Sequence, residues 1–370
     1  NFTSIQHAQG ISTKGYAPLP LRTGYEQVVA DRVDSFYAQT AKKKGKVIAL
    51  NKFAITVEYS DGEKVSVELG RVFGNAAGSS YPNDVVTDLK KGDKVGVGDT
   101  IAYNSNFFTP DPFNPKNSLW KGGKLARTAL MESVDTFEDS SAVSKSLSQG
   151  MASDVTKIRH VFVDFDQTIK NLVKVGDYLE PESILCTIED ALTSNTDVFN
   201  DDSIQSLKLL SNNAPKAKYG GKVDKVEILY YGDKGDMSES LKQLADQADK
   251  ELAKSRRALG KKVITGGLND SLRIDNKTLE MDTLVIKIYL TKEDLANTGD
   301  KLVFANQLKT IIARVLEGTN KSEDGQDIDA FFGYTSIANR VVLSPEIIGT
   351  TNTLLKVLSK KVADIYFDDK

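Results

Sequence analysis

The sequence predicts a mainly β protein with α+β insertions, organised as barrels or sandwiches rather than as a parallel α/β sheet. The main evidence is a set of alternating, β-branched runs, which occur at residues 46–50, 54–59, 64–69, 222–231, 283–290 and 307–316. Such alternation is typical of strands that bury one face. Long helical patterns are predicted only at residues 240–259 and at residues 351–366 near the C-terminal end.

Turn and loop signals separate the runs in the first third of the chain. Asp61-Gly62 joins the runs 54–59 and 64–69, and an Asp-Gly pair favours a hairpin because it tolerates positive φ. The polar segments 75–84 and 104–124, rich in glycine, serine or proline, predict loops.

The middle of the chain predicts short elements. Residues 127–147 combine a short strand with a helix that ends near Gly150, and residues 155–190 predict short strands with a turn at Gly176-Asp177. Residues 191–213 are polar, and we expect them to be mobile. In the helix 240–259, Ser240 and Gln243 form a capping-box pattern and Gly260 can end the helix.

Composition narrows the classes of function. The chain has 370 residues, enough for two or three domains with real cores. Its net charge of −3 gives no global positive field, although a basic stripe can exist within a balanced total. Cys186 is the single cysteine and His7 and His160 are the two histidines, which nearly excludes a structural zinc site. No apolar run is long enough for a membrane span, and no signal peptide is visible.

Familiar catalytic signatures, such as the phosphate loop, the nucleophile elbow and the H-E-x-x-H zinc motif, do not occur in the sequence. Residues 232–236 have the composition of a phosphate loop, but they read as a turn. Asp164 and Asp166 lack the third carboxylate of a magnesium site, because Gln167 and Thr168 follow them. We interpret both aspartates as solvent-facing residues on a strand.

Lys301 and Lys309 are the strongest candidates for chemistry. Both lie on predicted turns between buried strands, and each ammonium offers a compact charge with three donors that suits phosphate contact. On composition alone, the alternative that both are ordinary surface lysines is favoured.

A family resemblance begins at these lysines. Gly299-Asp300-Lys301, with Lys309 following before a β-branched strand, resembles the double-psi β-barrel of the β subunit of multisubunit cellular RNA polymerases. The chain departs from the family before Lys309, where residues 305–308 read A-N-Q-L in place of R-H-G-N and the family glycine is lost.

Further motifs follow in the family's order and extend the resemblance over about residues 15 to 350. Residues 324–329 with Arg340 resemble D-G-x-x-V/I-D and the arginine of P-S-R. Glu138 and Asp139 match the acidic pair of N-F-E-D-S, with Thr136 in place of the asparagine. The other matching stretches are residues 20–26, 90–102, 123–126, 174–177, 184–185 and 220–226.

The resemblance implies a double-psi β-barrel plus a flap-like sandwich-barrel hybrid domain. Residues 1–150 and 276–350 would form a discontinuous active-centre core with hybrid-binding segments. Residues 151–275 would form a flap-like domain with a helical insertion, and residues 351–370 a C-terminal helix.

The resemblance also implies the C-terminal part of a β-like subunit of a DNA-directed RNA polymerase, an enzyme that is active only in complex. Lys301 and Lys309 would act toward the RNA 3′ end and nearby phosphates, and Arg340 toward the triphosphate. Glu138 and Asp139 would lie near the second metal. The Mg²⁺ ions would be held mainly by a β′-like partner, and no metal is expected to be held firmly by this chain.

The implied partners are the β′-like subunit, a chain supplying the N-terminal part of β, DNA template and RNA, nucleoside triphosphates, and a sigma-like factor at the flap, with no membrane. A split or reduced β subunit of this kind is typical of large-genome bacteriophages, which implies the host cytoplasm or a virion as its location. The alternative, from another class, is a catalytically decayed β-like fold that serves as a structural or virion interaction protein.

Overall fold

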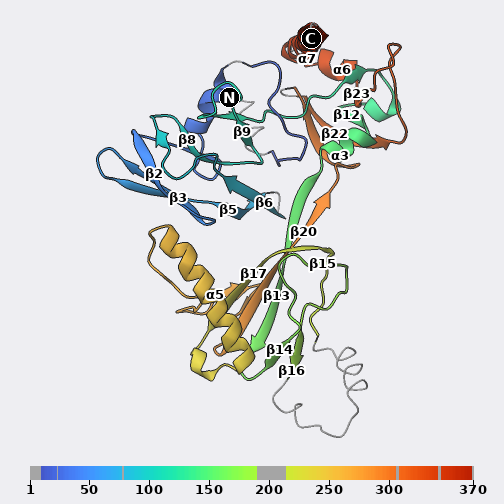
Figure 1. The fold of residues 1–370 in the computed structure, drawn as a ribbon. Helices are drawn as coiled ribbons and strands as arrows, with labels where there is room; N and C mark the ends of the chain where they lie inside the picture. Colours follow the sequence, from blue (N-terminus) through green and yellow to red (C-terminus); the bar gives the residue numbers. More distant parts are fainter. Residues whose placement is uncertain are drawn as a thin grey trace.

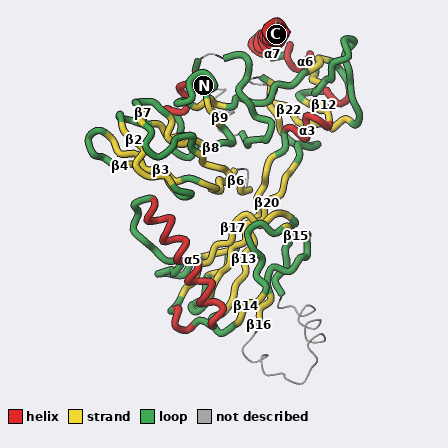
Figure 2. The backbone as a smooth tube through the Cα atoms, viewed as in Figure 1, coloured by secondary structure: helices red, strands yellow, loops and turns green. Residues whose placement is uncertain are grey.

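The computed structural model describes residues 10–22, 24–76, 79–189, 214–305, 308–340 and 343–368. It is mainly β, with 38% strand and 21% helix in several sheets, and the described residues form no closed barrel. The mainly β class is therefore confirmed, and the yellow strands of Figure 2 are more extensive than its red helices. Within these residues, no helix is both long and apolar enough to cross a membrane.

The largest sheet has eight strands in the order β1-β8-β6-β13-β20-β17-β15, and β5 pairs with β6 beside this path. Their bounds are β1 Ala38–Thr40, β5 Gly70–Ala76, β6 Ser79–Val86, β8 Thr100–Asn104, β13 Ser153–Asp164, β15 Tyr178–Leu179, β17 Gly221–Tyr231 and β20 Thr283–Asp294. The sheet extends through both the upper and the lower parts of the molecule in Figure 1.

A four-stranded sheet, in the order β4-β3-β2-β7, contains the three strands predicted near the N-terminal end. Its strands are β2 Gly45–Leu50, β3 Ala54–Tyr59, β4 Lys64–Glu68 and β7 Lys94–Val95. Gly62 turns the chain from β3 to β4 with φ 86°, which confirms the predicted hairpin. Val47, Ile55 and Val57 are buried in the core beneath this sheet.

A five-stranded sheet, in the order β11-β23-β12-β22-β21, lies in another part of the upper region. Its strands are β11 Thr128–Leu130, β12 Ser140–Ser144, β21 Lys301–Phe304, β22 Leu308–Leu316 and β23 Ala330–Phe332. β11 runs parallel to β23 and β12 parallel to β22, whereas β12 is antiparallel to β23 and β21 to β22. The helices near it are α3 Lys145–Gly150, α6 Tyr334–Ala338 and α7 Ser344–Asp368.

Short elements complete the fold. They are α2 Tyr25–Val28, η1 Val29–Asp31, β9 Phe108–Pro110, β10 Ser118–Trp120, η2 Val134–Thr136, β14 Thr168–Lys170, β16 Thr187–Glu189, η4 Lys234–Asp236, β18 Arg273–Ile274 and β19 Lys277–Thr278. The turn predicted at residues 232–236 is confirmed by η4. Asp164 and Asp166 are both exposed, as predicted, although Asp166 lies in a turn after β13.

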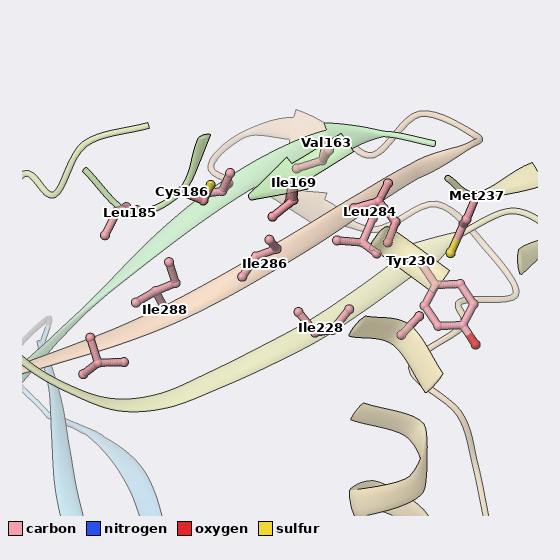
Figure 3. Packing of buried hydrophobic residues seen from close by; sticks show 14 of the residues in the cluster. Val163, Ile169, Leu185, Cys186, Ile228, Tyr230, Met237, Leu284, Ile286 and Ile288 are labelled. Atoms are coloured by element: carbon pink, nitrogen blue, oxygen red, sulfur yellow. The ribbon is translucent and has the colours of Figure 1, made fainter. Parts of the chain in front are cut away.

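The lower lobe (residues 153–294) is entered by β13 and left by β20, which pair antiparallel from Ser153↔Asp294 to Asp164↔Thr283. Leu284, Ile286 and Ile288 of β20 point into its core (Figure 3) and are fully buried. A lobe defined by this pairing extends past the predicted boundary at residue 275, because β20 is the central strand of its sheet.

Helix α5, Glu239–Ala258, lies against β14 and β17 of the lower lobe and buries Leu241 and Ala245. Its C-terminal end is as predicted: Gly260 has φ 65°, and the N–H groups of Gly260 and Lys261 donate to Arg257 and Arg256. The predicted capping box is wrong. The helix begins one residue earlier, and Ser240 Oγ instead accepts a hydrogen bond from Ile169 N.

The loop predicted at residues 75–84 is wrong, because β5 and β6 form a hairpin there with a register from Gly70↔Val85 to Ala76↔Ser79. Its polar residues are satisfied within the sheet: Asn83 Oδ1 accepts a hydrogen bond from Asn104 Nδ2 at 3.0 Å. Pairing in the sheet therefore overrides a local composition that favours a loop. The predicted loop 104–124 contains the short strands β9 and β10, and the segment 191–213 lies outside the described residues.

An arginine joins the lower lobe to the upper sheet. Arg71 of β5 makes two hydrogen bonds of 2.8 Å to Asp84 and one of 2.9 Å from Nη1 to Asp224 Oδ2. Asp224 is the extra residue at a register shift in β17, and such a bulge re-aims a side chain. Phe73 and Tyr289 pack beside this contact with ring centroids 4.6 Å apart.

We expect Ile286→Ala to lower the free energy of unfolding by about 2–5 kcal/mol, because it opens a cavity among fully buried side chains. The matched control is Ile311→Ala in β22, where 47% of the residue is exposed and the loss should stay below about 1 kcal/mol. Denaturant titration of the purified chain measures both. Equal losses would contradict the assignment of Ile286 to the core.

Candidate functional site

Lys301 and Lys309 lie on the same exposed face of the β21–β22 hairpin. Lys301 is directly opposite Ile311, and Val303 is directly opposite Lys309. These four residues are exposed, whereas Leu308, Thr310 and Ile312 are buried. The two lysines are diagonal neighbours across the strands, a relation that places side chains roughly 7–8 Å apart.

The structure corrects the predicted local setting of these lysines. Lys301 is the first residue of β21 and Lys309 is the second residue of β22, so both lie on strands rather than on turns. Their side chains still point away from the buried core, because alternate residues of a strand face opposite sides. Among the described residues, no carboxylate forms a salt bridge with either ammonium.

The acidic pair Glu138-Asp139 lies beside the same hairpin. It immediately precedes β12, which runs parallel to β22 with Ser140 opposite Ile311. The backbone N–H of Ile311 donates to Asp139 O at 3.1 Å. Ile311 therefore pairs with Lys301 on one side and with Ser140, the residue after Asp139, on the other.

Arg340 joins this group from the end of α6. Arg340 Nη2 lies 3.0 Å from Asp139 Oδ2, and Asp139 N donates to Ser336 Oγ at 3.3 Å. The Arg340 side chain is 32% exposed and that of Asp139 is 57% exposed, so water screens this ion pair. The predicted site residues thus come from three separate stretches of sequence that pair or make contact beside the five-stranded sheet.

Glu132 fixes the position of α6 relative to the acidic loop. The N–H and the hydroxyl of Thr335 donate to Glu132 Oε1 at 2.7 and 2.8 Å. The N–H bond comes first among the causes that hold the pKa of Glu132 below its ordinary value. Thr335 lies in the first turn of α6, so this carboxylate also satisfies a backbone donor that the helix leaves unpaired. Sequence reasoning missed Glu132 because its partner is 203 positions away in the chain.

The acidic pair is one of several places in the described chain where non-glycine residues have positive φ. Glu138 and Asp139 have φ values of 42° and 44°, in the left-handed region that side chains other than glycine rarely occupy. Ala305, in the loop before Lys309, has φ 49°. Strained residues of this kind persist where the surrounding structure holds them, and they cluster at functional sites.

Exposed apolar side chains border the charged residues. Val134 is 90% exposed and Phe137 is 68% exposed, and Leu130, Met131 and Tyr334 are about half exposed. Apolar groups gathered on a surface in this way are typical of an interface. The sequence indicates this apolar surface only weakly: Val134 and Phe137 interrupt an otherwise polar segment.

The site is a surface rather than a deep pocket. A hollow of about 710 Å³ lies elsewhere, in the lower lobe along β13, and is lined by Arg159, His160 and Lys277 among others. In the part of the chain that the structure describes, no three histidine, cysteine or carboxylate side chains are placed to hold a metal ion. The charged surface can attract anions through Lys301 and Lys309 and can position a group near Asp139.

Comparison with models of known protein families finds none that matches the chain, and comparison with curated proteins finds no match either.

The positive φ at Glu138 predicts that glycine is more stable than alanine at this position, the reverse of their usual order in a helix. We expect Glu138→Gly to be more stable than Glu138→Ala by about 1 kcal/mol, because glycine adopts positive φ without a Cβ clash. The control position is Gln247, which is exposed in the middle of α5. There the alanine variant should have a free energy of unfolding about 1 kcal/mol higher than the glycine variant. Thermal unfolding of the four variants gives both orders. The same order at both positions would show that Glu138 is unstrained.

Proposed function

We propose that this chain is the C-terminal part of a β-like subunit of a multisubunit DNA-directed RNA polymerase. One observation carries the proposal. The three stretches whose motifs resemble that family, around Asp139, Lys301–Lys309 and Arg340, contact one another or pair in one sheet although they are far apart in sequence. Chance matches of short motifs give no reason for such convergence.

The reaction we propose is template-directed nucleotidyl transfer, with each residue in a limited role. Lys301 and Lys309 supply positive charge toward the RNA 3′ end and nearby phosphates. Arg340, once released from Asp139, offers a planar two-pronged contact to the triphosphate. Carboxylates of the β′-like partner would hold Mg²⁺, which would supply activation of the RNA 3′ hydroxyl and stabilisation of the leaving pyrophosphate. Glu138 and Asp139 would lie near the second metal.

We propose further that the five-stranded sheet is part of a double-psi β-barrel. Support comes from its mixed pairing, in which β12 is parallel to β22 and antiparallel to β23. The lower lobe, with its long strands and the helix α5, would be the flap-like domain. A sigma-like factor is the proposed partner of that lobe.

The proposed assembly contains a β′-like subunit, a chain with the N-terminal part of β, DNA template and RNA, and nucleoside triphosphates. Its location would be the host cytoplasm or a virion. The exposed apolar residues beside Asp139, such as Val134 and Phe137, support a protein partner at this face.

The second candidate is a decayed β-like fold with a structural role. It is favoured by the ion pair that Arg340 forms with Asp139 and by the loss of the family glycine from the loop before Lys309. A co-purified or genetically neighbouring chain that carries D-F-D-G-D distinguishes the two functions, because only the polymerase requires those carboxylates.

Removing the lysines tests the mechanism. In the assembled complex, we expect the double variant Lys301→Ala, Lys309→Ala to slow transcript extension by on the order of 10²–10³ with assembly intact. The reason is that both side chains are exposed, so little packing is lost. A double variant at Lys46 and Lys64, exposed lysines on the four-stranded sheet, is the matched control. Undiminished extension by the Lys301, Lys309 variant would refute the mechanism even if the fold is right.

Arg340 should affect nucleotide use in a different way. We expect Arg340→Ala to raise the apparent KM for nucleotides and to lower kcat, and Arg340→Lys to recover only part of both. An ammonium cannot reproduce the two-pronged contact of a guanidinium. A decayed structural homologue predicts instead that neither variant matters and that no preparation synthesises RNA.

A further inference from the structure

Helix α7 leaves most of its length uncovered. It has 25 residues, of which Pro345 and Asn352 are buried. Every residue from Lys356 to Asp368 is exposed. The helix lies at the margin of the molecule beside α6 (Figure 1).

The exposed surface of α7 carries an apolar stripe. Its members share one side of the helix, since residues three, four and seven apart lie one above another. They are Ile347, Leu354, Leu358, Val362 and Ile365, which are 57–66% exposed. At about 100° per residue, all five fall within an arc of roughly 80°.

From Leu354 onward this stripe is separate from the side by which α7 contacts the protein, whereas the half-buried Ser344 and Thr351 lie within its arc nearer the start of the helix. Pro345, Ile348, Asn352 and Leu355 are buried or half-buried, and Asn352 Oδ1 accepts a hydrogen bond from Leu21 N at 3.0 Å. The centre of that contact side lies roughly 100° around the helix from the centre of the stripe. The contact with the chain's own body therefore does not account for the stripe.

An uncovered helix of this length needs another source of stability. Helices shorter than about 12–15 residues are marginal in water, and most helical stability in proteins comes from packing an apolar face. The segment from Lys356 to Asp368 has no such packing within the described residues. A second helix packed on the stripe would supply it.

The available area fits a small, transient interface. The five side chains of the stripe expose on the order of 600 Å² in total, which is less than the roughly 800 Å² that each partner contributes to a standard interface. Val357, Tyr366 and Phe367 are also exposed, but they lie around the other sides of the helix.

Charge beside the stripe indicates which partner fits. Lys361 lies within roughly 60° of the centre of the stripe, whereas Lys356 lies on the opposite side of the helix. In a parallel pair of two copies, Lys361 would oppose itself. In an antiparallel pair centred between Leu354 and Leu358, it would oppose the uncharged Thr351. A second copy therefore leaves this charge unpaired or repelled.

We propose that α7 is the docking site for an amphipathic helix of a different protein chain, with an apolar stripe and an acidic residue opposite Lys361. This inference does not depend on the polymerase proposal, because it uses only the exposure, periodicity and charge of α7.

Two synthetic three-heptad peptides test it on the full chain. Both carry leucine at the a and d positions of each heptad. One has glutamate and the other has lysine at the flanking e and g positions. We expect the glutamate peptide to bind at least about fivefold more tightly than its lysine twin, and Lys361→Glu to reverse that order. Lys356→Glu makes the same change of net charge away from the stripe and should keep the original order. Leu358→Asn should abolish binding of both peptides, with helical content unchanged by circular dichroism.

Other outcomes overturn the proposal. Equal affinity for the two peptides would contradict the proposed acidic partner. Failure of both peptides to bind would contradict the docking site itself. Sedimentation equilibrium of the chain alone tests whether a second copy of the chain occupies the stripe. Self-association that Leu358→Asn eliminates would assign the stripe to a second copy of this chain instead.

Discussion

The antiparallel pairing of β13 with β20 is the constraint on which the rest of the structure depends. The two strands are paired along all 12 residues of each. At one end the ladder continues through β6 into the upper sheet, and at the other end β20 forms the centre of the lower lobe's core. Because a slip of one residue would move every core side chain of β20 to the opposite face, the alternation of Leu284, Ile286 and Ile288 fixes this register.

The Arg71 contact adds orientation to that pairing. A pair of strands can still twist about its long axis. The Arg71 guanidinium binds both Asp84 and Asp224, and this contact restricts the twist where the upper sheet meets β17. The Asp224 side chain is only 7% exposed, so water screens this bond less than it screens an ion pair between two exposed side chains. The candidate site lies on a different sheet, and its own geometry depends on contacts with Asp139, Ser336 and Glu132.

Local pattern predicted the strands that bury one face, such as β3 and β22, and the C-terminal end of α5 at Gly260. Burial on one face of a strand and the turn after a helix both depend on a few neighbouring residues. It failed at β5 and β6, where pairing in a sheet decides the structure of a polar segment. For the site, the sequence identified Lys301, Lys309, Arg340 and the acidic pair by resemblance. It could not identify the contact of Arg340 with Asp139 or of Thr335 with Glu132, since each joins residues about 200 positions apart.

The course of the chain through β13 and β20 also makes the lower lobe a continuous insertion whose two ends lie side by side. Ser153 and Asp294 are directly opposite each other, so residues 153–294 leave and rejoin the upper part at nearly one point. Paired residues in an antiparallel ladder have Cα atoms only about 5 Å apart, which a tight turn can span. An ancestor could therefore have gained, lost or exchanged this whole lobe without moving the strands that carry Lys301, Lys309 and Asp139.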